Sequence, residues 1–223
     1  MQFVFNEKAG EKELGIKGEQ YKYLVKIRRH KAGEMIALRN PHRPELLYHY
    51  RIESIDGRRA HLVLKQSASE CLKAKHPLHI GWCVIDPKSV ERVLPMLNEL
   101  GVAKITFIYC RRSQKSFRPD FRRFERIAES SMQQCGRSER MKFELMEDLG
   151  SFLNAYPKTA VLDFCDDVLE DDMEIETVLI GCEGGFSEEE RELFSSCKTV
   201  RLDTPMILRS ESAAVAIAAK ILL

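Results

Sequence analysis

No histidine follows residue 79 in this chain of 223 residues; all six lie at positions 30, 42, 49, 61, 76 and 79. The later two thirds therefore cannot supply the imidazole of a Ser-His-Asp triad, a Cys-His pair or a histidine metal site. The sequence also lacks the GxxxxGK[ST] and GxGxxG patterns, which disfavours phosphate-loop hydrolysis and the usual dinucleotide site. The groups that remain for a functional site in this region are the backbone and the side chains of Arg, Glu, Ser and Asn. Such groups bind and position a reactive cofactor better than they activate a nucleophile.

The cysteines and apolar runs exclude further classes. Seven cysteines, at 71, 83, 110, 135, 165, 182 and 197, are odd in number and never form a CxxC pair. This usage is typical of a reducing compartment and argues against structural zinc, so we expect no metal. The longest late apolar run, residues 213–219, is too short to span a bilayer, and no signal-like segment opens the sequence. We expect a cytoplasmic protein with no membrane contact.

The net charge of +1 conceals an uneven distribution. Residues 1–80 carry 16 Lys and Arg against nine Asp and Glu, and residues 81–150 carry 13 against ten. Residues 151–223 carry six against 15. A basic front and an acidic rear indicate that one face meets a polyanion, although solvated helix faces are the simpler interpretation of any single stretch.

The first 70 residues are predicted to form a small β-rich unit. Strands are expected at 35–39, 46–55 and 59–64, and a helix at 19–29. The dipeptide Asp56-Gly57 suits a tight hairpin turn between the last two strands. Residues 71–77 are expected to be a linker.

From residue 78 to 223, predicted strands and helices alternate. The expected elements are strand 78–84, helix 90–100, strand 104–109, helix 119–134, strands 159–163, 177–180 and 199–202, and a last helix from 210. This order predicts an α/β domain with a mainly parallel sheet and helices on both faces.

The most informative stretch is a glycine loop at residues 181–187, Gly-Cys-Glu-Gly-Gly-Phe-Ser, which follows a short apolar strand. Its three glycines let the backbone approach a ligand closely. Such loops at the carboxyl ends of strands are where open α/β sheets bind ligands. Glu183 within the loop would repel phosphate, so the loop suits a neutral or positively charged ligand. Ser187 is a plausible N-cap of the acidic helix that follows.

A second motif, residues 207–214, reads Ile-Leu-Arg-Ser-Glu-Ser-Ala-Ala. Ser210 is expected to cap the final helix, with Glu211 favoured in its first turn by the helix dipole. On spacing alone, a docked C-terminal helix with Arg209 as a surface charge is the favoured interpretation.

A third stretch, residues 111–142, holds ten Lys and Arg against four acids. Basic segments of this kind bind nucleic-acid backbone. Phe117, Phe121 and Phe124 have helical spacing and are expected to pack this segment on the sheet.

Together these motifs resemble the RsmE family of small-subunit ribosomal RNA uridine N3-methyltransferases, of the SPOUT class. The glycine loop and the motif at residues 207–213 carry the resemblance, and Asn-Glu-Leu-Gly-Val at 98–102 and Gln-Cys-Gly-Arg at 134–137 extend it. The resemblance covers nearly the whole chain. It implies a SPOUT-type parallel sheet with a C-terminal trefoil knot, preceded by a PUA-like RNA-binding β-barrel.

The resemblance also implies S-adenosylmethionine as methyl donor, bound by three loops that follow strands. The implied cofactor-binding residues are Leu162, Phe164, Ile180, Gly181, Glu183, Gly184, Gly185, Leu202, Ile207, Leu208 and Ser212. Uracil N3 is mostly protonated at neutral pH, so catalysis must favour its deprotonated form. Arg209 would stabilise negative charge on a uracil oxygen. Either Glu183 or Glu211 would accept the proton.

The expected macromolecular partners are ribosomal RNA, or the small ribosomal subunit, and a second copy of the chain. The implied RNA-binding residues are Arg29, Lys88, Arg111, Arg112, Lys115, Arg122, Arg123 and Arg137. Two rival interpretations stay open at this point. One is a SPOUT methyltransferase that acts on transfer RNA, and the other is an RNA-binding protein without catalysis.

Overall fold

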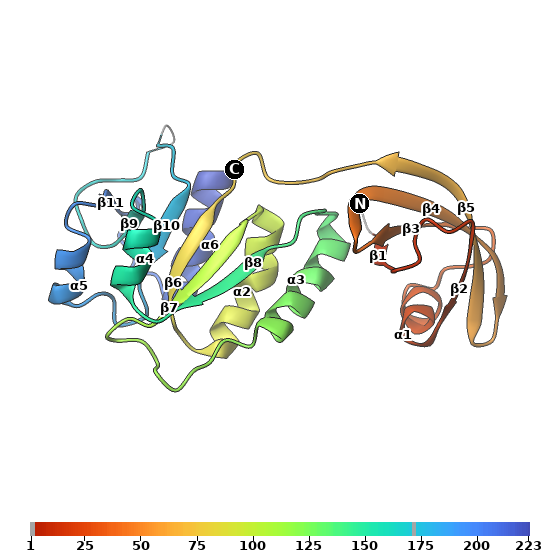
Figure 1. Ribbon diagram of the computed structural model, residues 1–223, viewed down its shortest axis with the longest axis horizontal. Helices are drawn as coiled ribbons and strands as arrows, with labels where there is room; N and C mark the ends of the chain where they lie inside the picture. The colour runs from red at the N-terminus through yellow and green to blue at the C-terminus, as the bar shows by residue number, and fades with distance from the viewer. Residues whose placement is uncertain (1–2, 171–172) are drawn as a thin grey trace. The chain divides into compact units, whose positions relative to one another are not determined.

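A computed structural model describes residues 3–170 and 173–223, and it forms two compact units (Figure 1). The N-terminal unit comprises the described residues up to Leu72 together with Gln133–Glu139. The α/β unit comprises Lys73–Met132 and Arg140–Leu223. Gln133–Glu139 joins the N-terminal unit through backbone bonds, such as that from the N–H of Phe3 to the carbonyl of Gln133, 3.1 Å.

The N-terminal unit is a curled five-stranded sheet in the order β1-β3-β4-β5-β2. Its elements are β1 (Val4–Phe5), β2 (Glu13–Lys17), α1 (Gly18–Tyr21), η1 (Lys22–Ile27), β3 (Met35–Asn40), β4 (Arg43–Asp56) and β5 (Arg59–Ser69). The predicted hairpin is confirmed, because Asp56 pairs with Arg59 across the turn and Gly57 has a φ of 42°. The edge strands β1 and β2 were not predicted, since neither has a long alternating pattern. Leu38, Tyr50 and Ile52 face the core of this sheet.

The α/β unit is built on a six-stranded sheet whose neighbouring strands all run parallel, in the order β11-β9-β10-β6-β7-β8. The strands are β6 (His79–Cys83), β7 (Lys104–Ile108), β8 (Lys142–Met146), β9 (Ala160–Leu162), β10 (Thr177–Ile180) and β11 (Thr199–Val200). The helices are α2 (Pro87–Leu100), α3 (Phe121–Cys135), α4 (Leu149–Ala155), α5 (Glu188–Leu193) and α6 (Ser210–Leu222). The predicted mainly parallel sheet is confirmed. Strand β8 was missed because it is a partly exposed edge strand that includes Lys142 and Glu144, and helix α4 because it has only seven residues.

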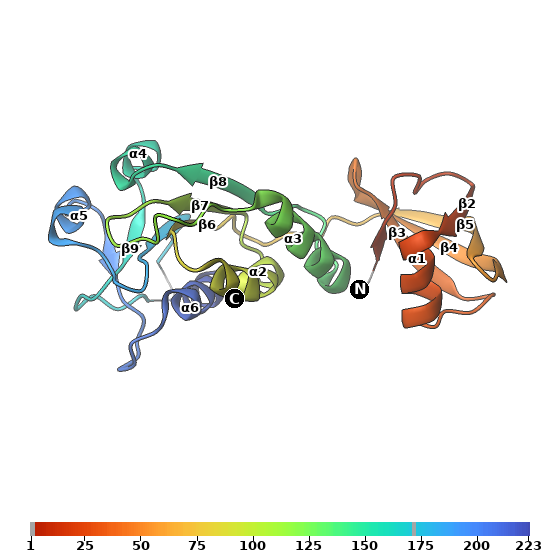
Figure 2. The same cartoon turned by 90° about the horizontal axis from the view of Figure 1, so that it is seen from below.

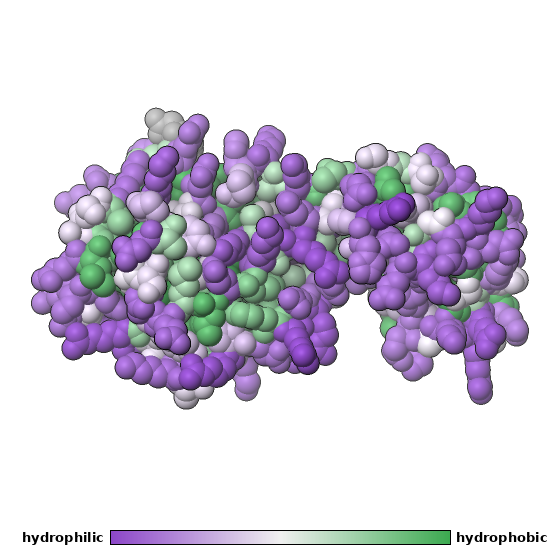
Figure 3. All heavy atoms as spheres, viewed as in Figure 1, coloured by the Kyte–Doolittle hydropathy of each residue, from purple (hydrophilic) through white to green (hydrophobic). Residues whose placement is uncertain are grey.

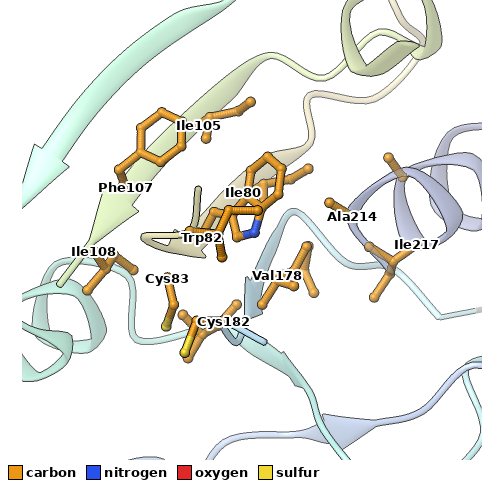
Figure 4. Close-up of a cluster of buried hydrophobic side chains, with 14 of the residues drawn as sticks. Ile80, Trp82, Cys83, Ile105, Phe107, Ile108, Val178, Cys182, Ala214 and Ile217 are labelled. Atoms are coloured by element: carbon orange, nitrogen blue, oxygen red, sulfur yellow. The ribbon is translucent and has the colours of Figure 1, made fainter. Parts of the chain in front are cut away.

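Helices cover both faces of this sheet. Successive residues of β6 point to opposite faces, so neighbouring residues contact different helices. Figure 2 draws α4 on one side of the strands and α2 and α6 on the other. Trp82 lies between Phe107 of β7 and helix α6 (Figure 4). The ring centroids of Trp82 and Phe107 are 6.1 Å apart. Gly81, one residue earlier, faces Phe152 of α4. Hydrophilic side chains cover most of the face shown in Figure 3, while the apolar core lies between these layers.

The predicted packing of the basic helix on the sheet is confirmed. Phe121 and Phe124 both contact Phe107, with ring centroids 6.4 and 5.4 Å apart.

Within the described residues, no helix is long and apolar enough to cross a membrane. Over the same residues, no group of three or more His, Cys, Asp and Glu could hold a metal ion.

The structure joins Cys83 and Cys110 by a disulfide, a pairing that cysteine count and spacing did not predict. The two residues are 27 positions apart in the chain, but their Cα atoms lie 5.7 Å apart. They come together because β6 and β7 are neighbouring parallel strands, and each cysteine lies at or just beyond the end of its strand. Sequence alone does not reveal which strands are neighbours.

His79 is buried at the start of β6, on the face that α4 covers. Its Nε2 lies 2.8 Å from the hydroxyl of Thr106, and its ring packs on Tyr156 at 4.4 Å between centroids. Burial, with Lys104 nearby, lowers the pKa of His79 from 6.5 to about 4, against a smaller opposite effect of Glu144. The imidazole is therefore neutral in the folded protein at neutral pH.

We expect the free energy of unfolding to fall by about 2 kcal/mol between pH 7.5 and pH 5, because the unfolded state takes up a proton at His79 that the folded state excludes. A folded pKa below the unfolded one means that this stability is complete above pH 6.5 and is lost as pH falls towards 4. Urea unfolding at both pH values measures the difference. In the His79→Gln variant the loss should shrink by most of that amount; an equal loss would contradict the assignment.

Candidate functional site

A cavity of about 310 Å³ lies where the chain leaves β9, β10 and β11. The carboxyl ends of parallel strands share one edge of the sheet, so three loops distant in sequence meet there. The lining residues are Leu162, Asp163, Phe164, Ile180, Gly181, Cys182, Glu183, Gly185, Phe186, Arg201, Leu202, Thr204, Met206, Ile207, Leu208, Arg209, Ser210 and Ala213. A cavity of this size with mainly apolar walls suits a small organic ligand.

The structure brings most of the expected cofactor residues to this cavity. Those that line it are Leu162, Phe164, Ile180, Gly181, Glu183, Gly185, Leu202, Ile207 and Leu208. Gly184 does not line it: a Cβ on Gly184 would lie 3.2 Å from Cδ of Arg112. Ser212 is exposed on α6 and is not in the lining either. Both differences arise because the geometry of the turn and of the helix start decides which backbone and side-chain atoms face the cavity, and sequence order does not fix it.

The glycine loop is held in shape by a turn and a helix cap. Gly185 has a φ of 65°, a left-handed conformation that favours glycine, and its N–H donates to the carbonyl of Cys182 at 2.9 Å. Ser187 caps α5 as predicted, with its hydroxyl accepting from the N–H of Glu190 at 3.2 Å. The carboxylate of Glu190 accepts in return from the N–H of Ser187 at 2.9 Å, which completes a capping box.

The start of α6 is fixed differently from the expectation. Arg209, not Ser210, occupies the N-cap, and no side chain caps the helix there. The hydroxyl of Ser210 instead donates to the carbonyl of Gly181 at 2.5 Å and accepts from the indole N–H of Trp82 at 2.8 Å. Since the indole can only donate, the hydroxyl proton must point to Gly181. A chain of hydrogen bonds thus connects the core to the glycine loop.

The three candidate catalytic side chains have different surroundings. Arg209 and Glu183 are exposed and line the cavity. Glu211 is buried, lies 4.0 Å from Arg92 and is absent from the lining. The first helical turn directs Glu211 towards Arg92 of α2 and not into the cavity, and its expected catalytic role stays a prediction.

Sequence reasoning missed two charged residues of the lining, Asp163 and Arg201. Asp163 accepts two hydrogen bonds from Arg191, at 2.8 and 3.3 Å, and Arg201 lies 3.6 Å from Asp203. Asp163 directly follows β9 and Arg201 directly follows β11. Their positions at strand ends could have predicted from the sequence that they line the cavity. Cys182 also lines the cavity, and burial raises the pKa of its thiol, which keeps it neutral.

A second hollow, of about 620 Å³, lies at the same sheet edge where the chain leaves β7 and β8. Its lining is Tyr109, Cys110, Arg111, Lys115, Arg118, Leu145 and Glu147. Three cations face one carboxylate there, so the hollow favours an anion. Arg118 donates to the hydroxyl of Tyr109 at 2.8 Å, while no residue of the described chain pairs with Lys115.

The other residues expected to bind RNA fall into different environments. Lys88, Arg122 and Arg29 are exposed. Arg123 forms two hydrogen bonds with Glu91, and Arg112 donates to the carbonyl of Gly184 at 2.6 Å. Arg137 is only 6 % exposed, and its expected contact with RNA stays a prediction. The cluster of charges in the sequence did not show that residues 133–139 fold against the N-terminal unit.

Comparisons with known proteins show the family of this chain. The RNA methyltransferase domain family matches residues 73–222. Two proteins named ribosomal RNA small subunit methyltransferase E, from two strains of Helicobacter pylori, are each 38 % identical to this chain and cover 98 % of both sequences. The solved ribosomal RNA small subunit methyltransferase E of Neisseria gonorrhoeae, bound to S-adenosylmethionine, has a TM-score of 0.80 at 17 % identity, over 98 % of this chain and 95 % of that one. The last likeness shows a shared fold.

Proposed function

Because the chain belongs to the RNA methyltransferase family, we propose that it transfers a methyl group from S-adenosylmethionine to N3 of a uridine in small-subunit (16S) ribosomal RNA. The observation that carries the proposal is the cavity at the ends of β9, β10 and β11, formed by the glycine loop and the motif around Arg209. Both motifs lie in a chain 38 % identical over almost its full length to enzymes of that name. The ribosomal substrate also favours the cytoplasm as its location.

The lining of the cavity fits S-adenosylmethionine. Apolar side chains such as Leu162, Ile180 and Leu202 can enclose a purine, and the loop backbone at Gly181 and Gly185 can bind its polar edge. When bound, the cofactor supplies an electrophilic methyl group on a positively charged sulfur. The Glu183 carboxylate and the absence of a phosphate loop suit that positive charge better than a nucleotide triphosphate.

Arg209 and Glu183 are the two exposed ionic groups proposed for the reaction. Arg209 donates to a uracil oxygen and so stabilises the negative charge that develops when N3 loses its proton. Glu183 accepts the proton or orients the base, since Glu211 is turned away towards Arg92. The target uridine must leave its stack to reach this edge.

Three further properties rest on the same proposal. The curled N-terminal sheet is taken as a PUA-like RNA-binding barrel, and the C-terminal segment as a SPOUT trefoil knot. The chain acts as a homodimer, because apolar side chains at the cavity are exposed, with Phe164 at 74 %, Met206 at 69 % and Ile207 at 82 %. A second copy would cover them. A monomer mass by light scattering at micromolar concentration would contradict the dimer.

The test is to map N3-methyluridine in ribosomal RNA from cells with and without this protein. Loss of one modified site in small-subunit RNA, restored by the wild-type gene but not by an Arg209→Ala copy, is the expected result. The purified protein should then methylate small-subunit RNA or subunits and leave transfer RNA unmodified. Modification of transfer RNA alone would replace this proposal with the rival substrate.

Replacing Ser210 by alanine should weaken S-adenosylmethionine binding about tenfold, because the hydroxyl that holds the carbonyl of Gly181 is lost and the indole N–H of Trp82 is left without a partner. Calorimetry measures the dissociation constant. Ser210→Thr keeps the hydroxyl and is the matched control, expected to bind within about threefold of wild type. Equal affinity in Ser210→Ala would show that this hydrogen-bond chain does not position the glycine loop.

A further inference from the structure

Two loops of the α/β unit that leave the same sheet edge are bonded to each other. We call residues 109–118, after β7, the basic loop, and residues 181–187, after β10, remain the glycine loop. Arg112 donates from Nη1 to the carbonyl of Gly184 at 2.6 Å. Its side chain also lies against that glycine, since a Cβ there would meet Cβ and Cδ of Arg112 at 3.3 and 3.2 Å. The contact therefore requires the arginine, and glycine at 184 leaves the arginine side chain room to lie against the loop.

A buried carboxylate makes the second connection. Oε1 of Glu190, the first turn of α5, accepts from the backbone N–H of Arg111 at 2.7 Å. Its Oε2 accepts from the N–H of Ser187 at 2.9 Å. One side chain thus bonds the backbone of both loops, and bonds from N–H groups to a carboxylate are stronger than neutral ones. On the surface nearby, Arg111 also pairs with Glu189 at 2.8 Å, which adds little by itself.

The two loops line different hollows. Gly181, Glu183 and Gly185 of the glycine loop line the cavity proposed for the cofactor. Arg111 and Lys115 of the basic loop line the cationic hollow. Movement of either loop would stretch the bonds that Glu190 and Arg112 make to the other loop.

We propose that Glu190 and Arg112 are positioning residues that couple cofactor binding to RNA binding. This rests on the proposed function. A ligand that orders the glycine loop also holds the basic loop in place for the RNA backbone, so each ligand raises the affinity for the other. Thermodynamic linkage requires the two effects to be equal in size. Arg112 therefore acts on the cofactor loop, although its charge pattern predicted only contact with RNA.

The first experiment measures the coupling in the wild-type protein. The probes are S-adenosylhomocysteine, which lacks the reactive methyl group, and transcribed small-subunit ribosomal RNA. We expect each probe to tighten binding of the other by about fivefold or more, with the same factor in both directions. If both probes bind but neither changes the affinity of the other, the coupling is overturned and the proposed function stands. If neither probe binds, the proposed function fails as well.

The second experiment compares two glutamates of the same helix. Glu190→Gln keeps the size of the side chain, but its amide nitrogen cannot accept from a backbone N–H, so one of the two loop bonds is lost. We expect the coupling factor to fall below about twofold. Glu192→Gln makes the same charge change at an exposed position of α5 and should keep the wild-type factor. Equal coupling in the two variants would overturn the role of Glu190.

The third experiment compares two cations of the basic loop and does not depend on a buried substitution. Arg112→Met should weaken S-adenosylhomocysteine binding about tenfold without RNA present, because the donor to Gly184 is lost. Lys115→Met removes the same charge from a residue that has no partner among the described residues, and it should weaken RNA binding only. If Arg112→Met leaves cofactor affinity at the wild-type value, Arg112 is a phosphate contact like Lys115 and its positioning role is wrong.

Discussion

Replacing Arg209 by alanine is expected to lower the rate of methyl transfer by about 100- to 1000-fold, the loss typical when one donor to a developing anion is removed. Arg209 is the N-cap of α6, is exposed and lines the cavity. The positive end of the helix dipole lies at the same place and adds to its effect. The guanidinium makes no ion pair within the described chain, so it is available to a substrate oxygen.

Single-turnover methylation of small-subunit RNA at saturating cofactor measures this effect, and calorimetry checks that cofactor affinity stays within about threefold. Arg201→Ala is the matched control, since Arg201 also lines the cavity but is paired with Asp203 at 3.6 Å. We expect at most a tenfold loss there. A similar loss in both variants would mean that the positive potential of the cavity matters and not a specific donor at Arg209.

Replacing Gly81 by alanine should destabilise the protein by about 1–3 kcal/mol or prevent folding of the α/β unit. Gly81 lies in the central strand β6, and a Cβ there would come within 2.3 Å of the ring of Phe152. The ring belongs to α4 and is fully buried, so it cannot simply move aside. Urea unfolding followed by far-ultraviolet circular dichroism measures the loss.

Two further variants make this a test of one contact. Phe152→Leu opens space opposite Gly81, so Gly81→Ala should destabilise that background by less than it destabilises wild type. Gly15→Ala, in β2 with nothing within 4 Å of the added carbon, should change stability by no more than about 0.5 kcal/mol. Additive effects of Gly81→Ala and Phe152→Leu would show that the strain lies elsewhere.

The family resemblance drawn from short motifs is confirmed by 38 % identity over 98 % of the chain. The glycine loop and the cap at Ser187 followed from residue types whose backbone preferences are strong and local. The Asp56-Gly57 hairpin followed for the same reason. Strand β8 and helix α4 did not, because β8 is a partly exposed edge strand without an apolar run and α4 has only seven residues in which to show a pattern.

Only the tertiary structure decided which side chains of the motifs face the cavity. Arg209, Ser210 and Glu211 are consecutive, and the first two line the cavity. Only Ser210 also joins Trp82 to Gly181, and Glu211 is buried near Arg92 outside the lining. Successive residues at a helix start point in directions about 100° apart, so proximity in sequence does not give a shared role.

The sequence by itself determined the α/β architecture with a mainly parallel sheet, the family and the segments that line the cavity, because periodicity, glycines and caps act over a few residues. The packing of parallel strands determined the rest. This packing brought Arg112 of the basic loop to Gly184 of the glycine loop, although the two residues are 72 positions apart in the sequence. It also placed Cys83 beside Cys110. It also bonded Arg112, an expected RNA contact, to the carbonyl of Gly184. Such contacts depend on which strands are neighbours, and that order is a property of the folded sheet.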